Sequence, residues 1–158
     1  MCATILLILL TLLGVMNLSG ENATMIDTVN DVCRVLSAET VTIDDVVAVT
    51  GHSPTSSGIH STSVQPNNNS FSRIVIETQS DVPSSVTLTL ADDYTLGSLQ
   101  DAFGDYQTVP RVRPSDSARV AFSVDTGDAF TCTIFANFDP LTEVSDDTHI
   151  DSLLIRRD

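Results

Sequence analysis

Residues 119–138 read RVAFSVDTGDAFTCTIFANF, in which two apolar runs flank a short polar stretch. The runs at 119–124 and 130–138 are rich in β-branched and aromatic residues, a composition typical of β-strands. Between them, residues 125–128 contain Gly127 and are typical of a hairpin turn. This stretch predicts a pair of antiparallel strands, and the rest of the chain extends that pattern.

Further strands are expected on both sides of this hairpin. Residues 73–77 and 86–90 are apolar and β-branched, and the sequence Asp-Val-Pro-Ser at 81–84 favours a turn between them. Residues 150–155 are interpreted as a final strand, although the apolar spacing there also suits a helix. The polar residues 53–70 are interpreted as a long loop or a weak edge strand.

Three segments begin with a helix-start signal. The segments 24–36, 42–51 and 95–104 each open on a Thr, whose side chain can cap a helix, and the first carries apolar residues at helical spacing. The other two end on Gly51 and Gly104, which we expect to adopt the left-handed conformation that commonly ends a helix. Together these patterns predict an α+β fold with short helices packed on an antiparallel sheet.

The second and third helical segments align without a gap, but only their first and last residues are identical. An imperfect tandem repeat is one interpretation of this alignment. Chance similarity between two short capped helices is the other.

The N-terminus has the features of an export signal. Residues 3–16 form an apolar run that is shorter than the about 20 residues of a membrane span, and the small residues Ser19 and Gly20 follow it. Residues 1–20 are interpreted as a signal peptide, with an uncleaved N-terminal anchor as the alternative. Residues 21–158 then form a single acidic α+β domain.

The composition of the 158 residues is strongly acidic. There are 21 Asp and Glu against seven basic residues, all of them Arg, for a formal net charge of −14. Such a surface repels phosphate backbones, so nucleic acid is not expected as a partner. Adaptation to high salt and an ordinary soluble secreted surface both account for this composition.

The cysteines predict one disulfide. Of Cys2, Cys33 and Cys132, the first would leave with the signal peptide, so the exported domain would keep a pair. A pair in an exported protein usually bonds, and its Cα atoms should then lie about 4.4 to 6.8 Å apart. Two buried free thiols are the alternative.

One segment resembles a catalytic motif. Gly51-His52-Ser53 follows an apolar run, as in the nucleophile elbow of α/β-hydrolases. However, Thr55 occupies the position of the second Gly, and Pro54 has no N–H to donate to an oxyanion hole. We therefore expect no catalytic residue and no enzymatic activity.

No metal or cofactor site is expected either. The three histidines are too scattered for a zinc site, and the Asp clusters do not follow the ligand spacing of a calcium-binding EF-hand. The histidines are His52, His60 and His149, and the Asp clusters lie at 92–93, 125–128 and 146–147. We interpret these residues as ordinary acidic residues in loops and as exposed histidines.

The arginines have two interpretations. They serve either as local partners of the acidic residues or as an anion-binding patch. The residues concerned are Arg111, Arg113, Arg119, Arg156 and Arg157.

A resemblance to a known type of domain rests on three features of the sequence. They are the two Thr-to-Gly helices, the strand at 130–138 with Cys132, and the ending at 150–155. In this architecture, residues 25–158 resemble the small exported α+β domains of the BamE and β-lactamase-inhibitor-protein type. The sequence departs from that type where no helix precedes Tyr94. The resemblance implies binding rather than catalysis, and it carries no site residue over to this chain.

These observations predict an exported, non-catalytic binding or inhibitor-like module that acts by surface complementarity, with another protein as its partner. A structural component of a cell-envelope or surface assembly is the alternative. Contact with a membrane is expected only through an uncleaved N-terminal segment.

Overall fold

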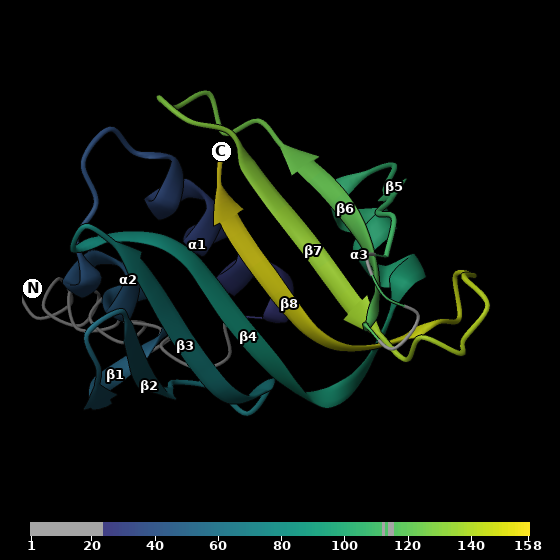
Figure 1. The fold of residues 1–158 in the computed structure, drawn as a ribbon, viewed down its shortest axis with the longest axis horizontal. Helices are drawn as coiled ribbons and strands as arrows, with labels where there is room; N and C mark the ends of the chain where they lie inside the picture. The colour runs from purple at the N-terminus through teal and green to yellow at the C-terminus, as the bar shows by residue number, and fades with distance from the viewer. Residues whose placement is uncertain (1–23, 112, 114–115) are drawn as a thin grey trace, which may run out of the picture.

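The computed structural model describes residues 24–111, 113 and 116–158, so the signal peptide predicted at 1–20 lies outside the described residues (Figure 1). These residues form three helices and one antiparallel sheet of eight strands in the order β1-β2-β3-β4-β8-β7-β6-β5. The helices are α1 (Met25–Ser37), α2 (Ile43–Thr50) and α3 (Leu96–Phe103). The strands are β1 (Gly51–Ser57), β2 (Ser61–Pro66), β3 (Phe71–Gln79), β4 (Val82–Thr95), β5 (Gln107–Thr108), β6 (Ala118–Val124), β7 (Cys132–Phe138) and β8 (His149–Arg157). The predicted α+β fold with helices packed on an antiparallel sheet is confirmed.

The three helices pack on one face of the sheet, and Figure 1 shows them behind it. Helix α1 contacts β4, β7 and β8 near the middle of the sheet, whereas α2 contacts β1 to β4. Helix α3 lies against β4 and β6, where the ring of Phe103 meets that of Phe122 edge-on at 6.2 Å. We call the helix-bearing side the covered face and the other side the open face.

The core lies between the covered face and the helices. Along the strands every second side chain points to this side, because a strand alternates its side chains between two faces. The buried residues that the sheet contributes include Ile74, Ile76, Val86, Leu88, Val120, Phe122, Ile134, Ala136, Leu153 and Ile155. Helix α1 contributes a buried stripe of Met25, Val29, Val32, Cys33 and Leu36, whereas Ile26 is only partly buried.

The helix starts are confirmed. The hydroxyls of Thr24 and Thr42 accept hydrogen bonds from the backbone N–H of Asp27 and Asp45, and each Asp carboxylate accepts from the backbone N–H of its Thr. This reciprocal arrangement is a capping box. The hydrogen bonds from the Thr side chains, followed by those from the Thr backbone, lower the pKa of Asp27 and Asp45. Thr95 caps α3 through the N–H of Ser98.

The two helix-ending glycines differ. Gly104 has the predicted positive φ, at 81°. The prediction for Gly51 is wrong, because its φ of −166° is extended backbone and the chain passes from α2 directly into β1. A Cβ at Gly51 would clash with the carbonyl oxygen of Gln65 in β2. Close approach of a neighbouring strand, not a left-handed turn, therefore requires glycine there.

The stretch at 53–70 is more ordered than predicted. It lies mainly in β1 and β2, so only β1 is the predicted edge strand and β2 lies inside the sheet. The strand signal was weak because β1 is polar and mostly exposed, and β2 buries only Thr62 and Val64.

Two turns differ from the predicted positions. The β3–β4 turn is formed by Ser80 and Asp81, both with positive φ, so the predicted turn residues Val82 and Pro83 belong to β4. Positive φ at both residues is typical of a two-residue hairpin turn. The β6–β7 connection runs over 125–131, and β7 therefore starts at Cys132 rather than at residue 130. Residues 150–155 lie in a strand, so their helical alternative is wrong.

A tandem repeat is not shown. Helix α2 precedes the four strands β1 to β4, and α3 precedes the four strands β5 to β8. The two sets are unequal, since β5 has two residues and β1 has seven.

Candidate functional site

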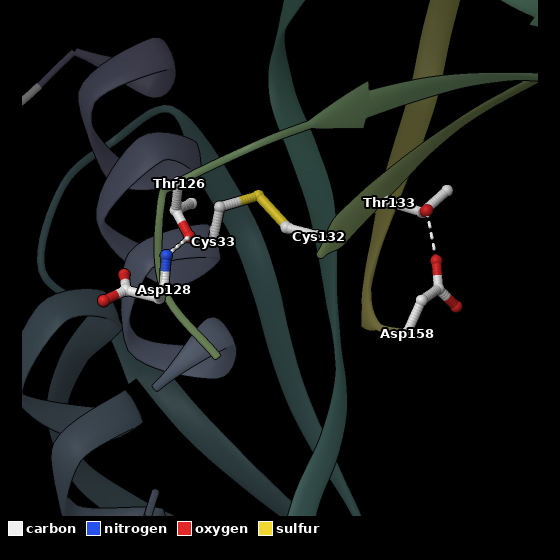
Figure 2. Close-up of a disulfide and its surroundings, with 6 residues drawn as sticks. All are labelled: Cys33, Thr126, Asp128, Cys132, Thr133 and Asp158. Atoms are coloured by element: carbon white, nitrogen blue, oxygen red, sulfur yellow. Dashed lines mark hydrogen bonds between the residues drawn. A yellow bond between two sulfur atoms is a disulfide. The ribbon is translucent and has the colours of Figure 1, made fainter. Parts of the chain in front are cut away.

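The two cysteines predicted to pair lie at disulfide distance. Cys33 on α1 and Cys132 at the start of β7 have Cα atoms 5.4 Å apart, inside the predicted range, and Figure 2 shows the bond between them. Both residues are fully buried, which makes this a structural cross-link between a helix and the covered face.

The catalytic motif considered from sequence does not have the required context. Gly51, His52 and Ser53 lie in β1, the edge strand that follows a helix, whereas a nucleophile elbow leads from a strand into a helix. His52 and Ser53 are exposed on this strand.

The histidines and Asp clusters do not converge. Among residues 24–111, 113 and 116–158, no group of three or more His, Cys, Asp and Glu side chains is placed to hold a metal ion. His149 lies 3.9 Å from Asp93, and both side chains are largely exposed. The histidines and Asp clusters therefore give one exposed His–Asp pair among the described residues, where β4 and β8 lie side by side.

Two hollows of the described surface lie near ends of the sheet. One of about 430 Å³ is lined by residues around the start of α2, including Thr42, Asp44 and Pro54. The other, of about 420 Å³, lies beside Phe130 and Arg157, whose guanidinium stacks on the Phe130 ring at 3.6 Å. In the first hollow the Thr42 hydroxyl is engaged in the cap of α2, through its hydrogen bonds with Asp45.

The open face has an apolar row through its middle. Strand register places five residues side by side across five strands, where their side chains point away from the helices. In spatial order they are Val75, Thr87, Leu154, Phe135 and Ala121. Leu and Phe therefore occupy its centre, on the side without a described helix.

Two polar rows run parallel to the apolar row. The first consists of Arg73, Thr89, Ser152, Asn137 and Arg119. The second consists of Glu77, Ser85, Arg156, Thr133 and Ser123. The three rows of five residues form the central part of the open face.

Phe135 lies next to two arginine side chains of this face. The guanidinium carbons of Arg119 and Arg156 lie 5.3 and 5.1 Å from the centroid of its ring, at cation–π distance. The two side chains cover the ring, which leaves Phe135 only 9 % exposed. An aromatic residue on the solvent side of the sheet therefore fixes two positive charges.

The arginines of this face differ in their partners. Arg156 forms an ion pair with Asp158 at 2.6 Å, and Asp158 also accepts a hydrogen bond from Thr133 (Figure 2). In the part of the chain that the structure describes, the side chains of Arg73 and Arg119 form neither an ion pair nor a hydrogen bond.

The arginine cluster considered from sequence is thus divided. Arg119 and Arg156 meet at Phe135, whereas Arg111 donates to the carbonyl oxygen of Pro140 at 2.9 Å in a separate loop. Sequence reasoning missed Phe135 and Leu154 as residues of the open face. Alternation along β7 and β8 contains this signal, because the buried partners Ile134 and Leu153 place their neighbours on the opposite face.

Comparison with protein-family models, curated proteins and solved structures found no match to the chain. The resemblance to BamE and β-lactamase-inhibitor-protein domains therefore stays a prediction. Within the described ranges, no helix has the length and apolar character needed to cross a membrane.

Proposed function

We propose that the chain is an exported, non-catalytic binding module that docks on another protein through the open face of its sheet. The observation that carries this proposal is the apolar row at the centre of that face, with Leu154 and Phe135 in adjacent strands. An antiparallel sheet with one solvated face ordinarily presents polar residues there. The partly exposed Leu154, beside a Phe135 ring that is covered only by arginine side chains, favours contact with a partner.

Two further features support this proposal. The cysteine pair is typical of proteins that fold in an oxidising compartment outside the cytosol. The open face is also built on the long central strands, which the disulfide and α1 hold from behind. A preformed surface loses little conformational freedom on binding, which favours affinity.

The test is capture of a stoichiometric partner from extracellular and envelope fractions by the immobilised protein. A Thr87→Glu variant places a carboxylate in the apolar row, and Thr40→Glu makes the same change in the exposed α1–α2 connection. We expect the wild type and Thr40→Glu to recover one partner in a 1:1 ratio, and Thr87→Glu to lose it.

Recovery that is equal for both variants would show that the open face is not the binding surface. Recovery only within a fixed multiprotein envelope complex would favour the alternative, a structural component of a cell-envelope assembly. Recovery of no stoichiometric partner would contradict the proposal.

A further inference from the structure

We infer that the partner of the open face is a folded protein whose contact surface presents two separated carboxylates along one side of an apolar patch. This inference rests on the proposed function and specifies the chemistry of the partner. Its basis is the placement of charge, which differs between the open face and the chain as a whole.

Positive charge is concentrated on the open face. The chain has 21 acidic residues and seven Arg, whereas the three rows of the open face hold three Arg and one acidic residue, Glu77. Asp158 reaches this face and neutralises Arg156. The balance on the face is therefore reversed relative to the chain, and Arg73 and Arg119 provide its unneutralised charge.

Arg119 is arranged to receive a carboxylate. Its guanidinium carbon lies 5.3 Å from the centroid of the Phe135 ring, at cation–π distance, and the residue is partly buried. The cation–π contact leaves guanidinium N–H groups for hydrogen bonds, and their fork geometry matches the two oxygens of a carboxylate. Ordering of the side chain by Phe135 reduces the entropy that binding would otherwise remove.

Arg73 lies at the other end of the same polar row. Four strand spacings of about 4.8 Å separate it from Arg119, a distance of about 19 Å. Between them lie Thr89, Ser152 and Asn137, which are hydrogen-bonding side chains without charge. One carboxylate cannot reach both arginines, so the partner must carry at least two, spaced along this side of the apolar row.

The acidity of the remaining surface selects the class of partner. A nucleic acid or an anionic membrane extends its charge well beyond the open face and would be repelled by the other acidic residues. At physiological salt, repulsion between charges is screened beyond a Debye length of about 8 Å, which is shorter than the open face. The acidic residues outside the face therefore repel mainly anionic groups that extend beyond it. A protein that confines its carboxylates to the contact avoids this repulsion.

The test uses defined probes and the 15N-labelled protein in NMR titrations. The first probe is the blocked peptide Gly-Glu-Ser-Leu-Ser-Leu-Ser-Glu-Gly, whose two Glu lie about 20 Å apart when extended, on the same side as the two Leu. The second has Gln in place of both Glu. The third is a vesicle of phosphatidylglycerol, which presents a continuous anionic surface.

We expect the Glu peptide to shift the Nε–H signals of Arg73 and Arg119 and to bind about tenfold more tightly than the Gln peptide at low salt. This difference should shrink when NaCl rises from 0.05 to 0.5 M, because salt screens exposed charges. A double variant, Arg73→Gln with Arg119→Gln, should bind both peptides equally, whereas Arg34→Gln on α1 should behave as the wild type.

Equal binding of the two peptides at the open face would overturn the carboxylate inference while leaving the proposed function intact. Vesicle binding that shifts the same signals would overturn it in favour of a membrane. Absence of any shift on the open face with the Glu peptide would also overturn it, and the capture experiment decides the proposed function separately.

Discussion

Leu153 and Leu154 are adjacent in β8, yet they belong to different parts of the molecule. Leu153 is fully buried on the covered face, whereas Leu154 lies on the open face beside Phe135 and is only partly buried. The covered face obtains its stability from helices of the same chain. The open face carries comparable side chains with no described helix over them. The comparison indicates that stability and binding reside on opposite sides of one sheet, and mutations can separate them.

The largest effect should come from the disulfide, which ties α1 to the covered face. Replacing Cys33 and Cys132 together with Ala should lower the free energy of unfolding by about 4 kcal/mol, because the bond closes a loop with a sequence separation of 99 residues. Urea unfolding followed by circular dichroism measures this change. An unchanged midpoint would show that the covered face does not depend on this link.

The two leucines sharpen the comparison directly. Leu153→Ala should cost about 3 kcal/mol of stability, since it leaves a cavity under the helices. Leu154→Ala should cost less than about 1 kcal/mol, because solvent can occupy the space that it leaves. The same urea titration compares them, and equal losses would contradict the distinction between the faces.

The two glycines separate a packing requirement from a backbone requirement. Gly51→Ala should cost about 2 kcal/mol and increase hydrogen exchange in β1 and β2, because the new Cβ would meet the backbone of Gln65. Gly104→Ala should cost about 1 kcal/mol through backbone strain at positive φ, with no atom within 4 Å of the new Cβ. Exchange confined to β1 and β2 in both variants would refute this assignment.

The helix caps should give the smallest effect, and it depends on pH. Thr42→Ala should cost about 1 kcal/mol at pH 7 through loss of the cap. Hydrogen bonds from Thr42 lower the pKa of Asp45 below its ordinary 3.8, so this stabilisation is present above that value and is lost as pH falls through the folded pKa. Melting temperatures at pH 7 and pH 2 should therefore differ less for Thr42→Ala than for the wild type. An equal difference in the two proteins would contradict the assigned pKa shift.

Much of the fold follows from local sequence signals. The Thr caps, the apolar stripe of α1 and the β6–β7 hairpin were predicted because each signal lies within a few residues. The extended conformation of Gly51 and the position of β2 inside the sheet were not predicted, because both depend on which strands pair with one another. The open face required two levels of information: which strands pair, and which alternate residues the helices leave uncovered. The meeting of Arg119 and Arg156 at Phe135 depends on the same pairing.

The measurement that tests the central claim most directly is the affinity of the captured partner for Leu154→Ala, with Thr40→Ala as the matched control outside the open face. Isothermal titration calorimetry gives both dissociation constants. We predict that Leu154→Ala weakens binding by about tenfold or more while its unfolding free energy stays close to that of the wild type, and that Thr40→Ala changes neither. Unchanged affinity in Leu154→Ala, or equal weakening in both variants, would contradict the assignment of binding to the open face.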